Sequence, residues 1–195
     1  MTKFKETFRI ESARLKEWDY SSPWWYYITI NTKDNVEYFG RIENEKILLN
    51  ELGRIVEVEW LKTKELRANV DLDCFVVMPN HFHGIVIING PEVETHRMRL
   101  PHQMRLSNNI CNSRDACDAS LRLVQNCLSD IVRGFKSAVT KRIRQYGYQN
   151  FSWQARFYDR IIRNEKELFN IRKYIEQNPL KWYLEKNNPE NICEL

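Results

Sequence analysis

Two kinds of apolar pattern alternate along the chain. Stretches rich in apolar, aromatic and β-branched residues are typical of strands. Segments 70–78 and 82–88 are separated only by a short break at Pro79-Asn80, so we expect them to form a hairpin at the centre of a sheet. The last predicted strand is basic, and we expect it at an edge. The predicted strands cover residues 23–31, 38–39, 70–78, 82–88 and 153–162.

Apolar residues that recur every three or four positions predict amphipathic helices between these strands. The second helix ends at Gly147, and the third begins at Asn164, a good N-cap with Glu167 three residues later. We expect this last helix to stop near Gln177, because the α conformation is disfavoured for the residue before Pro179. The apolar stripes are Leu48, Leu52, Ile55 and Trp60 in the first helix; Leu121, Val124, Leu128, Ile131, Phe135, Val139 and Ile143 in the second; and Leu168, Ile171 and Ile175 in the third.

The order of these elements predicts an α+β fold, a ferredoxin-like sandwich. Its antiparallel sheet would carry helices on one face, and an extra helix would follow at the C-terminus. A length of 195 residues fits one domain over residues 1–195. Residues 89–120 are polar and lack periodicity, so we predict a flexible insertion there.

The composition argues against a membrane protein. Charged residues make up 29% of the chain, and we find no run of about 18 apolar residues and no signal peptide. We therefore expect a cytoplasmic protein. The five cysteines form no Cys-x-x-Cys pair, which indicates free thiols. An alternative is a zinc site within the insertion, whose spacing fits poorly; its ligands would be His96, His102, Cys111 and Cys117.

Basic residues are concentrated in one part of the chain. Between Arg133 and Arg163 the single acidic residue is Asp159. Such a local excess of positive charge is expected of a surface that contacts phosphate, and the alternative is a solvated helix face. The basic residues of this segment are Arg133, Lys136, Lys141, Arg142, Arg144, Arg156, Arg160 and Arg163.

A His-x-His motif is the sharpest local feature. His81 and His83 lie two positions apart on a predicted strand, so their side chains point to the same face. Two adjacent imidazoles can hold a divalent cation. One alternative is a pair of surface histidines. Another is the site of histidine-triad nucleotide hydrolases, but the third position of that motif is Ile85 here.

The last helix carries a second motif. Tyr174 and Asn178 are four residues apart and therefore share one face of the helix. Tyr174 lies at the edge of the apolar stripe, from which it could point at a neighbouring sheet face. The alternative is an ordinary tyrosine at the edge of the core, followed by a residue that ends the helix.

Together these motifs resemble the REP-associated tyrosine transposases, relatives of the single-tyrosine HUH transposases of small insertion sequences. The combination is specific, because a His-hydrophobic-His pair is followed about 90 residues later by Tyr-Ile-x-x-Asn-Pro. The matching segments span most of the chain; they are residues 18–21, 26–30, 38–40, 76–85, 135–137, 159–165 and 174–179.

The resemblance implies roles for individual residues. His81, His83 and Asn178 would bind a divalent metal, Mg²⁺ or Mn²⁺, and Tyr174 would be the nucleophile. Tyr158 and Tyr183 are rival nucleophiles. The DNA-binding residues are expected to be Arg133, Lys136, Arg160, Arg163 and Lys173.

The implied activity is that of a metal-dependent single-strand DNA endonuclease and strand-transferase, a transposase. It would act on hairpin or palindromic DNA through a 5′-phosphotyrosyl intermediate, as a monomer or a homodimer. A non-catalytic regulator that binds DNA hairpins on the same fold is the main alternative. A relaxase of the same superfamily is another, although relaxases usually have a larger chain.

Overall fold

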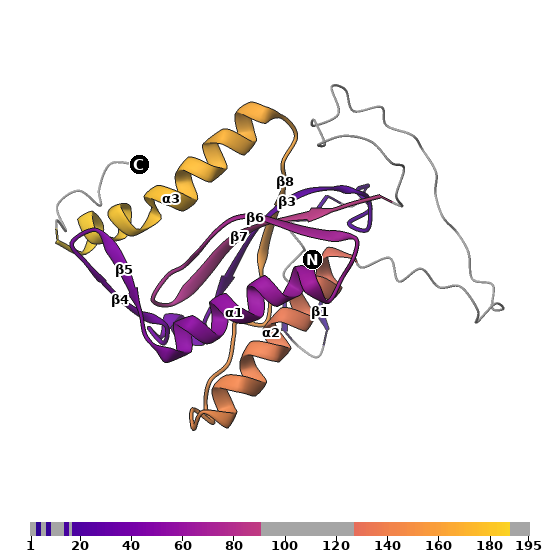
Figure 1. Ribbon diagram of the computed structural model, residues 1–195. Helices are drawn as coiled ribbons and strands as arrows, with labels where there is room; N and C mark the ends of the chain where they lie inside the picture. The colour runs from indigo at the N-terminus through magenta and orange to yellow at the C-terminus, as the bar shows by residue number, and fades with distance from the viewer. Residues whose placement is uncertain (1–2, 5–6, 9–13, 16, 91–126, 188–195) are drawn as a thin grey trace.

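A four-stranded antiparallel sheet forms the centre of the computed structural model (Figure 1), which describes residues 3–4, 7–8, 14–15, 17–90 and 127–187. The strand order is β6-β7-β3-β8. The sheet strands are β3 (Trp24–Asn31), β6 (Val70–Val77), β7 (His81–Ile88) and β8 (Tyr158–Ile161). The other elements are β1 (Lys3–Phe4), β2 (Thr7–Phe8), a 3-10 turn η1 (Lys33–Asn35), β4 (Gly40–Glu43), β5 (Lys46–Leu49), α1 (Glu51–Glu65), α2 (Leu128–Gln145) and α3 (Glu165–Asn187).

The predicted ferredoxin-like sandwich is confirmed. The elements β3, α1, β6, β7, α2 and β8 follow one another in the β-α-β-β-α-β order. Helices α1 and α2 cover one face of the sheet, and the C-terminal helix α3 lies across the other (Figure 1). None of the helices in the described part of the chain is long and apolar enough to cross a membrane.

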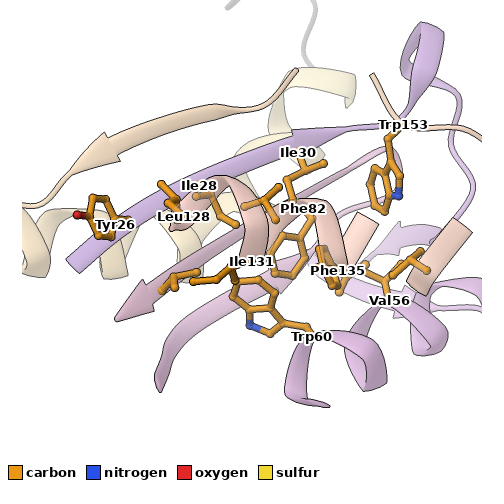
Figure 2. Close-up of a cluster of buried hydrophobic side chains, with 14 of the residues drawn as sticks. Tyr26, Ile28, Ile30, Val56, Trp60, Phe82, Leu128, Ile131, Phe135 and Trp153 are labelled. Atoms are coloured by element: carbon orange, nitrogen blue, oxygen red, sulfur yellow. The ribbon is translucent and has the colours of Figure 1, made fainter. Parts of the chain in front are cut away.

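The main core lies between the sheet and helices α1 and α2 (Figure 2). Alternate residues of β3 and β7, among them Ile28 and Phe82, point into it together with Trp60 of α1 and Phe135 of α2. Gly84 is required here, because a Cβ at this position would lie 2.8 Å from atoms of both Phe82 and Trp60. Close packing of large rings therefore fixes both helices against this face.

Only one strand of the hairpin predicted at the centre of the sheet is an interior strand. β7 is an interior strand between β6 and β3, but β6 is an edge strand. The reason is that β3 pairs with both β7 and β8, which leaves β6 with a single neighbour. The expected edge position of the last strand is confirmed, although β8 is shorter than residues 153–162. Within that range Trp153 forms an isolated bridge with Thr32.

The region before α1 also differs from the prediction. Residues 38–39 are not a strand; they lead into a hairpin of β4 and β5, which turns through Asn44 and Glu45 at positive φ. Leu48 belongs to β5, and α1 starts after Asn50, whose side chain accepts hydrogen bonds from two backbone N–H groups of the first turn. In the second helix, the predicted positions Leu121 and Val124 lie outside the described residues, as does the insertion apart from residues 89–90.

The prediction that the last helix stops near Gln177 is wrong. Helix α3 continues through Pro179 to Asn187, although a proline inside a helix costs about 3 kcal/mol. Tertiary contacts offset this cost, because the turns after Pro179 pack against β4 and β5. Trp182 in this extension contacts His81, with ring centroids 5.6 Å apart, and Lys186 forms an ion pair with Glu37 at 2.6 Å.

Candidate active site

The α3 face of the sheet carries the two histidines of the His-x-His motif. The ring centroids of His81 and His83 are 4.6 Å apart on β7, so the prediction that they share one face is confirmed. Across the sheet, Thr29 of β3 is the register partner of His83. Phe82, which lies between His81 and His83 in the sequence, points to the opposite face and into the main core. The pleat of one strand therefore separates the site from the core.

Two hydroxyl groups hold the ring of His83. Its Nδ1 lies 2.7 Å from the Tyr27 hydroxyl and 2.9 Å from Thr29 Oγ1. Its Nε2 is buried and has no hydrogen-bond partner among the described residues. A proton on Nδ1 has two oxygen acceptors, whereas a buried proton on Nε2 would have none, which costs about 1–3 kcal/mol. The favoured tautomer thus presents the Nε2 lone pair to the site.

An amide side chain holds the ring of His81. Its Nδ1 lies 2.7 Å from Asn80 Oδ1. Burial lowers the pKa of His81 to about 4, although the nearby side chain of Asn178 on α3 acts to raise it. Burial and the neighbouring His81 lower the pKa of His83 to about 3. Both imidazoles are therefore neutral at pH 7, the form that binds metal ions.

Helix α3 brings the second motif to the histidines. The ring centroid of Tyr174 lies 5.3 Å from that of His83 and 6.3 Å from that of Tyr27. Tyr174 is 42% exposed, whereas Asn178 is only 6% exposed. A small apolar cluster fixes the helix in this position; it consists of Tyr27, Ile85, Ile162, Leu168, Ile171 and Ile175. The tyrosine ring is thus held on one side and accessible on the other.

The side chains that meet here fit an open metal site. His83 offers an unpartnered nitrogen, His81 a neutral ring, and Asn178 an amide oxygen. No cluster of three or more histidine, cysteine or acidic side chains suited to a metal occurs within the described ranges, so a third protein ligand would have to be another oxygen donor, for which the amide of Asn178 is a candidate. Three protein ligands at most would leave positions open for water or substrate oxygen, as in catalytic sites.

Sequence analysis did not identify Tyr27, Thr29 or Trp182 as parts of the site. Tyr27 and Thr29 are two positions apart on a strand, which was a signal that they share a face. Only the pairing of β3 with β7 shows which face that is. Trp182 was missed because α3 was expected to end before it.

The rival tyrosines lie in different places. Tyr158 of β8 is the register partner of Thr29, and its ring centroid lies 6.4 Å from that of Tyr27. It is therefore near the histidines, with its side chain 53% exposed. Tyr183 instead lines a small cavity of about 160 Å³ between α3 and the β4–β5 hairpin.

The five residues expected to bind DNA are spread over three elements. Arg133 on α2 forms an ion pair with Asp130 at 2.6 Å, and Arg160 on β8 forms one with Glu167 at 2.5 Å. Lys136 donates a hydrogen bond to the Gln154 carbonyl. The remaining two, Arg163 and Lys173, are exposed.

Comparison with known proteins supports the fold. No family model matches the chain. A solved structure of a REP-associated tyrosine transposase bound to a REP hairpin aligns with a TM-score of 0.52 at 21% sequence identity. The alignment covers 89% of this chain and 74% of that chain. At this identity the likeness establishes a shared fold.

A protein relative is much closer in sequence. An uncharacterized protein of Haemophilus influenzae (strain ATCC 51907 / DSM 11121 / KW20 / Rd) is 36% identical over 171 residues, which is 88% of each chain. The chain belongs to the same family as this Haemophilus influenzae protein.

Proposed function

We propose that this protein is a metal-dependent single-strand DNA endonuclease and strand-transferase, a tyrosine transposase that acts on hairpin or palindromic DNA. The observation that carries the proposal is the contact of the Tyr174 ring with His83, whose buried Nε2 is without a partner in the described structure. The fold shared with a transposase that was solved bound to a REP hairpin supports the choice of substrate.

His81, His83 and Asn178 would hold the metal. When bound, a Mg²⁺ or Mn²⁺ ion would supply the positive charge that polarises the scissile phosphate and offsets the charge that develops on it. Tyr27 and Thr29 orient His83 through Nδ1, so that Nε2 stays free for the ion. Asn80 does the same for His81.

Tyr174 would perform the nucleophilic step. Its phenolic oxygen attacks the scissile phosphorus and loses its proton to solvent, while the bond from phosphorus to the 3′ oxygen breaks. The products are a 5′-phosphotyrosyl bond and a strand that ends in a 3′-OH after it takes up a proton. One phosphoester bond replaces another, so a second 3′-OH can reverse the step and rejoin strands without ATP.

The surroundings of Tyr174 suit a single-stranded substrate. The ring packs on Tyr27 and His83, so little side-chain entropy is lost when DNA binds. Lys173, next to Tyr174 on α3, and Arg163, just before the start of α3, are exposed and would contact the DNA backbone. Arg133, Lys136 and Arg160 remain proposed DNA contacts. Arg133 and Arg160 would first exchange their acidic partners for phosphate.

A denaturing gel tests this proposal. A labelled hairpin oligonucleotide with single-stranded flanks is incubated with the protein and Mn²⁺, and the expected result is a protein–DNA adduct that survives denaturant. The adduct should disappear with EDTA and in Tyr174→Phe. The matched control is Tyr158→Phe, which removes a hydroxyl near the same histidines and should leave the adduct intact.

An adduct that persists in Tyr174→Phe but not in Tyr158→Phe would contradict the choice of nucleophile. If the protein binds several hairpins tightly and forms no adduct with any of them, it is the non-catalytic hairpin-binding regulator.

A further inference from the structure

A groove of about 580 Å³ lies between the C-terminal half of α2 and the loop that leads to β8. Among the described residues that line it, three side chains are cations, three carry hydroxyl groups and none is acidic. Small-molecule pockets of similar size, about 300–1,000 Å³, are lined mainly by apolar side chains. The cationic and hydroxyl-bearing residues are Lys136, Lys141, Arg144, Ser137, Thr140 and Ser152.

The positive charge of this groove is not neutralised by the protein. Other basic residues of the same segment have acidic partners: Arg133 pairs with Asp130, Arg142 with Glu59, and Arg160 with Glu167. In contrast, Lys136 and Arg144 donate to the backbone carbonyls of Gln154 and Phe151. Lys141 is exposed, and within the described ranges no acidic side chain pairs with any of these three. Three of the eight basic residues of the 133–163 segment thus line one groove without an acidic partner among the described residues.

Helix capping explains only part of this arrangement. Cations favour the last turn of a helix because of its dipole, which accounts for Arg144 and, one turn earlier, for Lys141. Lys136 lies in the middle of α2, where the dipole has little effect. Burial lowers the pKa of Lys136, so a charge here reduces stability unless an anion compensates it.

The opposite wall of the groove is held rigidly in place. The backbone carbonyl of Ser152 accepts a hydrogen bond from the N–H of Lys33 at 2.9 Å, and the N–H of Gln154 donates one to the backbone carbonyl of Asn31 at 2.9 Å. Trp153 between them is 8% exposed and packs in the main core. Asn31 is the register partner of His81. The groove and the histidines therefore lie at the same end of the sheet, on opposite faces.

We propose that this groove binds the phosphodiester backbone of the paired stem of a DNA hairpin, apart from the phosphate that is cut. The inference rests on the proposed function for DNA as the partner. Phosphate oxygens accept hydrogen bonds only, which matches a lining of ammonium, guanidinium and hydroxyl donors. Single-strand sites also need exposed aromatic rings on which bases stack. The one ring that lines this groove, Trp153, is buried.

The salt dependence of binding tests the inference. The dissociation constant of a fluorescein-labelled DNA hairpin is measured by anisotropy over a range of salt concentrations, with EDTA present to prevent cleavage. In Lys141→Gln/Arg144→Gln the slope of log K against log salt should become shallower by about one for each charge removed, with weaker binding at every salt concentration. Binding of an unpaired oligonucleotide of the same length should fall less.

The matched control is Lys46→Gln/Arg54→Gln, which removes the same charge from exposed residues of β5 and α1 outside the groove. It should retain the wild-type slope. The Lys141 side chain forms no hydrogen bond or ion pair with the described residues, so Lys141→Gln alone gives the same test without risk to the fold. Thermal melting of every variant checks this.

Groove variants that keep the wild-type affinity and slope would overturn the inference and leave the proposed nuclease untouched. An equal loss for hairpin and unpaired DNA would overturn the assignment to the stem. A wild-type protein that binds no hairpin would overturn both the inference and the proposed function.

Discussion

The two faces of the central sheet are built by the same strands and have different roles. On the α1–α2 face, Tyr26 is fully buried, accepts a hydrogen bond from the Trp18 indole and donates one to the Ser22 carbonyl. On the α3 face, the next residue, Tyr27, directs its hydroxyl to His83. The Tyr26 hydroxyl thus has both of its hydrogen bonds within the protein, whereas the buried Nε2 of His83 has no partner among the described residues. The comparison shows that a pleated strand can supply a core and a reactive site at once.

The largest expected effect is a loss of stability from a substitution on the α1–α2 face of the sheet. Phe82→Ala removes a ring that packs against Trp60 at 4.6 Å between centroids, and we expect a loss of about 3–5 kcal/mol in the free energy of unfolding. Urea denaturation measures it. His83→Ala, one position away but on the α3 face, should lower the free energy of unfolding much less. Equal losses for the two variants would contradict the division between a structural and a reactive face.

Two adjacent tyrosines sharpen the comparison. Tyr27→Phe keeps the ring but removes a hydroxyl from His83, so Mn²⁺ should bind roughly tenfold more weakly or worse, as measured by titration calorimetry. Tyr26→Phe is the matched control on the other face. It should lower stability by about 0.5–1.5 kcal/mol for each hydrogen bond lost and leave Mn²⁺ affinity unchanged. A change of Mn²⁺ affinity in both variants would point to general loosening of the sheet.

A smaller effect concerns Glu59, whose buried carboxylate lies on α1. Burial alone would raise the pKa of Glu59, but hydrogen bonds from Arg142 and Lys62 lower it overall. A carboxylate whose pKa is lower in the folded state stabilises the protein above the unfolded-state pKa, near 4.5, and this stabilisation is lost as pH falls through the folded-state value.

Glu59→Gln should therefore reduce stability at pH 7 and flatten its decline below about pH 5, as measured by urea denaturation across pH. Arg142→Gln should act in the same direction and more weakly, because Lys62 still pairs with the carboxylate at 3.3 Å. If the stability of Glu59→Gln declined below about pH 5 as steeply as that of the wild type, other groups would be the cause of the acid sensitivity.

Local patterns in the sequence were sufficient for much of the site. Two histidines two positions apart on a strand must share a face, and Tyr174 and Asn178, one turn apart on a helix, must as well. That these two pairs meet could not be derived from spacing, because it depends on α3 crossing the face opposite α1 and α2. Likewise, the hydroxyl groups of Tyr27 and Thr29 reach His83 only through the pairing of β3 with β7.

The basic segment illustrates the same limit. The sequence showed an excess of charge between Arg133 and Arg163, but not which charges have partners. Arg133 and Arg160, expected to contact DNA, are ion-paired with acids on their own or a neighbouring element. Lys141 and Arg144, which were not among the residues predicted to bind DNA, line the groove without an acidic partner among the described residues. Ion pairs such as that of Arg142 with Glu59 join residues far apart in the chain.

The sequence by itself determined the order of the main helices and strands, the sandwich fold, and that the residues of each motif share one face, because these follow from periodicities of two and 3.6 residues. The tertiary structure decided which strand became an edge, how far α3 runs past Pro179, and which side chains gather around His83. These outcomes depend on contacts between residues distant in sequence, such as Trp182 with His81. The free energy of such contacts outweighs local preferences, which amount to a few kcal/mol at most.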